Sequence, residues 1–298
     1  MTTPRLVFAS PRKLPRADEL DGRVVVLDIA FASDGLGKGF DKTTGRFIER
    51  LGARLAAWVD HHDHPRHVDF AGDDRFVLCT KAEHGACPEM ITAEMVARVG
   101  PVDTIMAHFD LDGLYAAAKW ILGGKEPYAG ADDDARCVDT RIGEPSATAK
   151  LVDAALRAGY RDETLKQRVV QWLVQGRPSG AAKDDIERHA EIYLAMERGA
   201  KQIASRFEVT DDIALVTIKS SDPPFDKTEL LLLGQQVATV AVVADSGNVS
   251  IAAPFDSGLD FVDLLELGGG MPTRVNVPKK RLEASLELIR GALAQRRG

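Results

Sequence analysis

The chain has 298 residues, of which 45% are hydrophobic, and its formal net charge at pH 7 is −7. This length allows one large domain or two modest ones, and the apolar content excludes a disordered polymer. The negative charge argues against long duplex nucleic acid as a partner, because binding phosphates along a duplex requires a basic face.

The cysteines and the N-terminus bear on the cellular setting. Cys79, Cys87 and Cys137 form no Cys-x-x-Cys pair and leave an odd thiol, which is typical of a reducing cytosol. Prolines and basic residues interrupt the first 15 residues before an apolar signal core could form, and no apolar run is long enough to span a bilayer. We therefore expect a soluble cytoplasmic protein with no membrane partner.

The N-terminal half alternates predicted strands and helices. Val24–Leu27 is an apolar run of the buried parallel-strand type, and it ends on Asp28. After it we expect a loop at 35–45, a helix near 47–57, a strand ending at Asp60, a strand at 75–79, a helix at 88–99, a strand at 102–107 and a helix at 114–122. This alternation predicts a doubly wound, mostly parallel sheet.

The C-terminal half predicts a second, smaller α/β domain. Residues 146–207 are largely helical with a break at 176–180, and the long amphipathic helix at 184–206 would link the two domains. Strands are expected at 214–219, 237–244 and 248–253, with a closing helix after Pro278. We place the first domain at 1–185, the linker helix at 186–209 and the second domain at 210–298.

The triplet Asp60-His61-His62 is the first candidate for chemistry. It follows the apolar run Leu55–Val59, which suggests a buried strand that delivers the triplet to a sheet edge, where α/β proteins bind their ligands. Carboxylate and imidazole together suit a divalent transition metal such as Mn²⁺ or Zn²⁺.

Further acids follow other predicted strands. These are Asp28, the motif His108-x-Asp110-x-Asp112-Gly113, and Asp139 after the short run 136–138. Alternate residues of an extended segment share a face, so the three polar residues of the motif can converge, and Gly113 would allow a sharp turn into a helix. Carboxylates pooled at one edge repel one another. Two divalent ions about 3.5–4 Å apart would resolve that repulsion and create a phosphoryl-transfer centre.

Some of the polar and glycine-rich segments also fit simpler structures. Asp110–Gly113 alone could be a turn, and Asp132-Asp133-Asp134 is typical of a solvated loop. The glycines at 35–39 lack the spacing of a phosphate-binding nucleotide loop, which we therefore reject. A single-zinc hydrolase built on His61, His62 and His64 has little support, because adjacent strand residues point to opposite faces.

The acid and histidine motifs together resemble the DHH phosphoesterase superfamily, named for the triplet found here at positions 60–62. The C-terminal part resembles the DHH-associated domain of the oligoribonuclease and RecJ-like branch, in which a glycine-rich substrate loop matches Gly268, Gly269 and Gly270. The resemblance implies two domains. The first would bind two Mn²⁺ ions, for which Mg²⁺ or Co²⁺ could substitute, and the second would bind substrate.

The resemblance also implies a role for each residue. Six would be metal ligands: Asp28, His61, His108, Asp110, Asp112 and Asp139. Asp28 would bridge the ions, with His108 and Asp110 on one of them and the remaining three on the other. His62 would face the scissile phosphate, Asp60 would orient the histidines, and the glycine loop would offer backbone N–H groups to the substrate.

Three features depart from the family pattern. The His-x-Asp-x-Asp-Gly motif follows Asp28 and the triplet, whereas it usually precedes them, so a permuted strand order would have to bring the ligands together. One residue instead of three separates His108 from Asp110, as in the archaeal exonuclease-like branch. Met271 stands where the glycine loop usually ends in histidine.

We therefore expect a manganese-dependent phosphoesterase that uses two-metal-activated hydroxide. Its partner would be a small nucleotide or short oligonucleotide, namely an oligoribonucleotide, a cyclic dinucleotide or a phosphorylated adenosine nucleotide. Met271 and the permuted motif order motivate an alternative, a catalytically weak nucleotide-binding sensor that retains the fold. A homodimer stays an open alternative.

Overall fold

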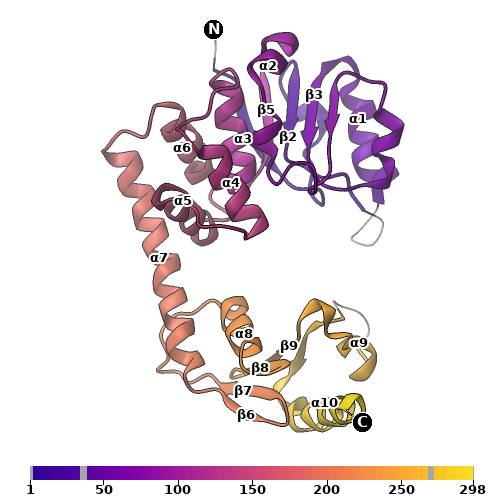
Figure 1. Cartoon of the computed structure of the whole chain (residues 1–298), viewed down its shortest axis with the longest axis vertical. Coiled ribbons are helices and arrows are strands. Elements are labelled where there is room, and N and C mark those ends of the chain that lie inside the picture. Colours follow the sequence, from indigo (N-terminus) through magenta and orange to yellow (C-terminus); the bar gives the residue numbers. More distant parts are fainter. Residues whose placement is uncertain (1–2, 34–38, 268–271, 298) are drawn as a thin grey trace. The chain divides into compact units, whose positions relative to one another are not determined.

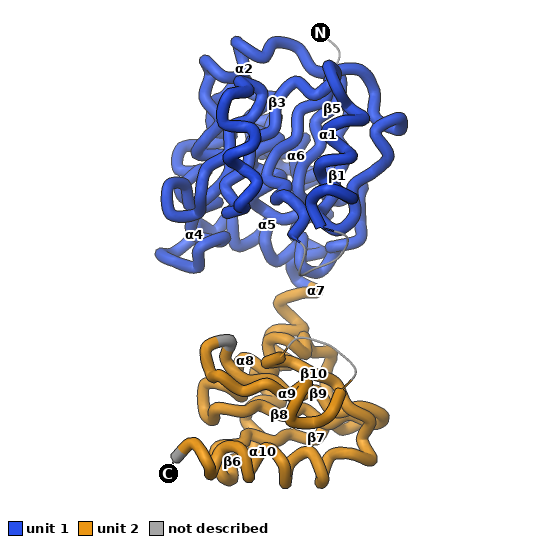
Figure 2. The backbone as a smooth tube through the Cα atoms, turned by 90° about the vertical axis from the view of Figure 1, so that its right-hand side faces the viewer, with its two compact units in different colours: residues 1–191 blue, residues 192–298 orange. Residues whose placement is uncertain are grey.

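The computed structural model describes residues 3–33, 39–267 and 272–297. The chain forms two compact units, Met1–Glu191 and Ile192–Gly298, coloured separately in Figure 2. The boundary between the two units, after Glu191, falls within helix α7 (Ala181–Ala204). It also falls within the predicted linker 186–209. Within the described ranges, no helix combines the length and the apolarity needed to cross a membrane.

The first unit is built on a five-stranded, all-parallel sheet. Its strands are β1 (Arg5–Ala9), β2 (Val24–Leu27), β3 (Leu55–Asp60), β4 (Phe76–Leu78) and β5 (Thr104–His108), in the spatial order β1-β5-β2-β3-β4. Figure 1 shows α1 (Arg46–Leu51) on one side of this sheet and α3 (Leu111–Ile121) on the other. The predicted doubly wound parallel sheet is confirmed.

Alternation along β2 explains why both faces are covered. Val24 and Val26 belong to one apolar cluster with Phe47 and Leu51 of α1. Successive strand residues point to opposite faces, so Val25 and Leu27 face the other side. All four β2 residues are fully buried, as a central strand between two helical layers requires.

Several predicted boundaries around α1 were wrong. Residues 39–45, expected in a loop, are helical and run directly into α1. The helix expected to reach residue 57 ends at Leu51, because Gly52 adopts a positive φ of 54° that an α-helix cannot contain. Strand β3 then begins at Leu55. Strand β1 was not predicted, since its five residues lie close to the prolines at 4 and 11.

Helical assignments beyond β4 also differ from the sequence prediction. The segment predicted as one helix at 88–99 is a 3₁₀ turn, Cys87–Met90, followed by α2 (Ala93–Val99), whose N-cap Thr92 accepts the N–H of Met95 at 3.1 Å. Helix α3 begins at Leu111 with Asp110 as its N-cap, three residues earlier than expected.

The acidic run at 132–134 and Asp139 all lie on one helix, α4 (Ala131–Thr140). The predicted solvated loop and the predicted strand before Asp139 were therefore both wrong. The three acids occupy the first turn of α4, where negative charge is favourable near the positive end of the helix dipole. A run of three residues such as 136–138 cannot by itself distinguish a strand from a helix.

Three helices complete the first unit: α5 (Ala147–Ala158), α6 (Glu163–Val174) and the start of α7. The expected helical region with a break at 176–180 is present. Gly176, Arg177 and Gly180 in this break all have positive φ, which no continuous helix allows.

The second unit contains a mixed five-stranded sheet of order β10-β9-β8-β7-β6. Its strands are β6 (Glu208–Thr210), β7 (Ile213–Thr217), β8 (Val240–Ala244), β9 (Asn248–Ala252) and β10 (Arg274–Pro278), and only β7 and β8 pair in parallel. Helix α10 (Leu282–Arg297) packs on one face through Leu286 and Ile289. Helix α8 (Lys227–Gln235) packs on the other through Leu230, and the short α9 (Phe261–Leu264) precedes β10. A second, smaller α/β unit was expected and is present.

Candidate metal centre

The strand order brings the predicted ligands to one edge of the first sheet. β2 lies between β5 and β3, so the residue after β2, Asp28, is flanked by His108 on β5 and by the triplet at the end of β3. The chain runs outward from β2 to β4 and then crosses back to place β5 beside β2. Such a reversal point, at the carboxyl ends of parallel strands, is where open α/β sheets bind ligands.

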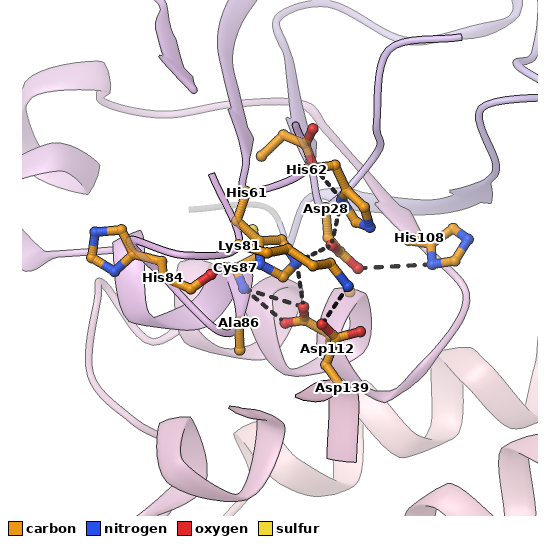
Figure 3. A network of polar contacts seen from close by, with 12 residues as sticks. Asp28, His61, His62, Lys81, His84, Ala86, Cys87, His108, Asp112 and Asp139 are labelled. Atoms are coloured by element: carbon orange, nitrogen blue, oxygen red, sulfur yellow. Dashed lines mark hydrogen bonds and ion pairs between the residues drawn. The ribbon is translucent and has the colours of Figure 1, made fainter. Parts of the chain in front are cut away.

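The candidate ligand atoms fall into three groups, within each of which they lie at most 4.8 Å apart. The groups are Asp28 with His61 and His62, Asp28 with His108 and Asp110, and His61 with Asp112 and Asp139. All six predicted ligands are thus brought together, as Figure 3 shows for five of them. Asp28 and His61 each belong to two groups and connect the centre.

His61 is held with one nitrogen toward the acids. Its ring is fully buried, and Nδ1 lies 2.9 Å from the backbone carbonyl oxygen of His84, to which it can donate its proton. Nε2 then carries the lone pair and lies 3.1 Å from Asp112 Oδ2 and 3.4 Å from Asp28 Oδ1. A histidine that donates one N–H to a carbonyl and presents the other nitrogen is the usual arrangement of a metal ligand.

His62 and Asp60 form a separate pair. Nδ1 of His62 lies 2.9 Å from Oδ1 of the fully buried Asp60, while one third of the His62 side chain is exposed. Asp60 therefore orients His62. The orientation of His61, which was also expected to depend on Asp60, comes from the His84 carbonyl instead.

Asp112 is fixed by a backbone group that the sequence did not indicate. The N–H of Cys87 lies 3.0 and 3.2 Å from the two Asp112 oxygens, and both residues are buried. Cys87 begins the 3₁₀ turn 25 residues earlier in the chain, so only the tertiary fold shows this contact.

Gly113 has a steric role in the same helix. A Cβ at this position would lie 2.4 Å from the carbonyl oxygen of His108, closer than real contacts allow. The glycine therefore permits the first turn of α3 to pack against the end of β5. It does not form the sharp turn expected from the sequence, because α3 already begins at Leu111.

Several buried polar atoms of the centre form no hydrogen bond of good geometry among the described residues: both carboxylate oxygens of Asp28, Oδ2 of Asp60, Nε2 of His61 and Nδ1 of His108. The two histidine nitrogens nevertheless lie at ion-pair distance from carboxylates, His61 Nε2 3.1 Å from Asp112 and His108 Nδ1 2.7 Å from Asp110. Buried polar atoms are nearly always hydrogen-bonded, so such a cluster needs an explanation. Carboxylate oxygens and imidazole nitrogens are the donors that Mn²⁺ and similar divalent ions accept. The residues present therefore fit divalent metal ions.

The pKa shifts of Asp28, Asp112 and His61 also indicate that positive charge is favourable beside the buried carboxylates of the centre. Burial, together with the negative charges of Asp112 and Asp110, raises the pKa of Asp28 well above its usual range. Burial also raises the pKa of Asp112. For His61, burial lowers the pKa, but the contacts with Asp112 and Asp28 outweigh it and raise the pKa to about 11.

The backbone of Asp28 is itself in an uncommon conformation. Its φ is 57°, in the left-handed region that few residues other than glycine adopt. Aspartate is one of the residues besides glycine that tolerate this conformation, and five other non-glycine residues of the described ranges also adopt a positive φ.

Lys81 is a polar residue of the centre that the sequence analysis missed. It follows β4 and places Nζ 2.7 Å from Asp139 Oδ2 (Figure 3). Its position just after a strand end was the available signal. An ion bound by this Asp139 oxygen would have to displace the Lys81 ammonium. Gly268, Gly269, Gly270 and Met271 lie outside the described residues.

Comparisons with known proteins give low-identity likenesses. No protein-family model and no curated protein matches the chain. One similar solved structure is PggH, a pGpG-specific phosphodiesterase from Vibrio cholerae, which is 11% identical, with 92% of this chain and 99% of that one covered and a TM-score of 0.43. Another is exonuclease RecJ bound to manganese, which is 12% identical, with 93% and 76% covered and a TM-score of 0.46.

Proposed function

We propose that this chain is a metal-dependent phosphoesterase of the DHH type, which hydrolyses a phosphodiester or phosphomonoester of a small nucleotide. One observation carries the proposal: buried ligand atoms of Asp28, His61 and His108 that form no hydrogen bond among the described residues meet at the ends of three adjacent parallel strands. The carboxylates of Asp28, Asp110 and Asp112 also repel one another at this edge, and bound cations would neutralise that repulsion.

The ligand sets follow the groups seen in the structure. Asp28, His108 and Asp110 would hold one ion, while His61, Asp112 and Asp139 would hold the other. We propose Mn²⁺ because it accepts both carboxylate and imidazole ligands. When bound, two such ions supply a water of lowered pKa and positive charge beside the phosphate oxygens.

The surrounding residues orient the substrate and exclude water. Asp60 accepts the Nδ1–H of His62 and so directs its Nε2 toward the pocket that both His62 and His108 line. When protonated, Nε2 of His62 can donate its proton to the ester oxygen that leaves. His61 and Asp60 are fully buried and exclude solvent from the inner side of the centre.

The test is hydrolysis of bis(p-nitrophenyl) phosphate by protein first stripped of metal and then given Mn²⁺. We expect turnover only with added ion, and a loss of about a hundredfold or more in Asp112→Asn. Asp74→Asn removes an exposed carboxylate of the same unit and should retain full activity. Absence of turnover with every divalent ion tried, or full activity in Asp112→Asn, would refute the proposal.

A further inference from the structure

A pocket of about 1030 Å³ in the first unit adjoins the candidate metal centre. His62 and His108 line one part of it, and among its other lining residues are six basic side chains: Arg12, Lys13, Lys42, Arg46, Arg50 and Lys81. Arg16 also lines it but is paired with Asp18. Asp63 is the one acidic side chain among the described lining residues. A chain of net charge −7 therefore concentrates positive charge beside the carboxylates of the candidate metal centre.

The parallel sheet explains why these residues meet there. Ala9 at the end of β1 lies opposite His108 at the end of β5, so the residues after β1 begin beside the centre. They form a tight turn in which the N–H of Lys13 donates to the carbonyl oxygen of Ser10 at 2.9 Å. Arg12 and Lys13 are thereby placed at the same sheet edge as the metal ligands.

The second basic segment is also fixed in place. Lys42 and Arg46 flank Thr44, which is buried and whose hydroxyl accepts the N–H of Ala32 at 2.9 Å. This hydrogen bond connects the helical turn before α1 to the segment that follows Asp28 and β2. The cations of both segments are therefore carried on ordered backbone, which reduces the entropy lost when a ligand is bound.

Four of these cations lack a protein counter-charge. Arg12, Lys13, Lys42 and Arg46 are exposed, and across the described ranges none of them forms an ion pair. Unpaired cations gathered in one pocket attract anions and increase the rate at which they arrive. Arginine and lysine are also the side chains that recognise phosphate groups, through charge-assisted hydrogen bonds.

We propose that Arg12, Lys13, Lys42 and Arg46, here called the basic wall, bind a second phosphate of the substrate. The preferred substrates are then nucleotides with at least two phosphate groups, one cleaved at the metal centre and the other held by the basic wall. This inference rests on the proposed function and narrows its substrate class.

Two chromogenic esters that differ only in a second phosphate test this inference. They are thymidine 5′-(p-nitrophenyl phosphate) and the same compound with a 3′-phosphate, and both release p-nitrophenol. With Mn²⁺ present, we expect kcat/KM of the wild-type protein to be at least about tenfold higher for the 3′-phosphorylated ester, as for one charge-assisted contact. In the double variant Lys42→Ala/Arg46→Ala, the ratio of the two kcat/KM values should fall toward one.

A matched control removes equal charge elsewhere on the first unit. Arg98→Ala/Lys125→Ala replaces two exposed cations outside the pocket and should keep the wild-type ratio. Two results would overturn phosphate binding by the basic wall while leaving the proposed function intact. One is equal kcat/KM of the wild type for both esters, and the other is an unchanged ratio of the two kcat/KM values in Lys42→Ala/Arg46→Ala. Cleavage of neither ester, in a protein also inactive on bis(p-nitrophenyl) phosphate, would overturn both.

Discussion

The buried ring of His61 is hydrogen-bonded through Nδ1 to the backbone carbonyl oxygen of His84, at 2.9 Å. This bond assigns the proton of the neutral imidazole to Nδ1 and leaves the lone pair of Nε2 facing Asp28 and Asp112. The ring is therefore oriented for metal binding by a backbone group. Once neutral, it can bind an ion without rotating.

The proton on His61 should make the stability of the metal-free protein depend on pH. Its folded pKa of about 11 lies above the ordinary value of 6.5, so between these two pH values the folded state holds the additional proton. The contribution of His61 is then fully present below pH 6.5 and is lost as the pH rises to about 11. Urea unfolding in EDTA should show the free energy of unfolding falling over this range. In His61→Gln the free energy of unfolding should fall less steeply with pH. Identical slopes in the two proteins would contradict a raised pKa of His61 in the folded state.

Metal binding should release protons for the same reason. Near pH 7.5, an ion that takes the lone pair of Nε2 must displace the proton held there by Asp112 and Asp28. Calorimetric titration with Mn²⁺ in two buffers of different ionisation enthalpy measures the number released. We expect about one proton or more per chain, and equal heats in both buffers would count against a histidine ligand.

Asp112→Asn should stabilise the metal-free protein although it removes metal binding. The neutral amide can still accept the Cys87 N–H. It loses the attraction to His61, but the pKa of Asp112 is raised overall, mainly by burial, so its charged form costs more stability than that attraction returns. We expect Tm in EDTA to rise by about 3 °C, corresponding to roughly 1 kcal/mol. Added Mn²⁺ should raise Tm in the wild type but much less in the variant. A lower Tm in EDTA would show that the charged form of Asp112 does not destabilise the metal-free centre.

The substitution His62→Gln tests whether His62 is a metal ligand or a residue that faces the substrate. His62 lies near Asp28 and His61, but Asp60 already fixes its Nδ1 and its side chain is one-third exposed. We expect two Mn²⁺ ions per chain to remain by metal analysis, while kcat falls about 10²–10⁴-fold. A count that drops to one ion would instead make His62 a ligand.

Gly113→Ala should be destabilising even though alanine is the better helix former. The added Cβ would meet the His108 carbonyl oxygen at 2.4 Å, so the end of β5 or the start of α3 must shift. A cost of about 1–3 kcal/mol is expected, measured by urea unfolding. Gly72→Ala serves as control, since its Cβ would meet no atom within 4 Å. A stability gain in Gly113→Ala would contradict the close packing of α3 on β5.

Asp245 in the second unit should contribute stability that is lost in acid. The ion pair with Lys227 at 2.8 Å, together with the N–H groups of Asn248 and Gly247, lowers its pKa to about 2. Because the folded pKa is below the ordinary 3.8, this stability is present above pH 3.8 and is lost as the pH falls to about 2. Asp245→Asn should lower Tm at pH 7 and have little effect near pH 2. The exposed Asp263 gives a control of equal charge change in the same unit, Asp263→Asn.

The sequence predicted the sheet and the convergence of the ligands because those depend on local pattern. The apolar runs before Asp28 and Asp60 identify buried parallel strands, and parallel strands bring their carboxyl ends to one edge. The order of motifs along the chain did not prevent this, because β5 lies beside β2 in space.

Contacts between distant segments could not be predicted in the same way. Two hydrogen bonds of the centre connect residues more than 20 positions apart: His61 to the His84 carbonyl, and the Cys87 N–H to Asp112. Each uses a backbone atom, which every residue type has, so the sequence could not indicate them. Asp139 was found at the site but on helix α4 instead of a strand, since a run as short as 136–138 suits either element.

The position of β5 has a consequence for synthesis of the chain on the ribosome. β1 pairs with β5 and β2 pairs with β5 and β3, so β1 cannot join the sheet until residues 104–108 have emerged. The acids at 110, 112 and 139 emerge later still. A nascent chain therefore carries Asp28 and the triplet for some time before their partners exist. The ligand set His61, Asp112 and Asp139 can therefore be completed only after residue 139 has emerged.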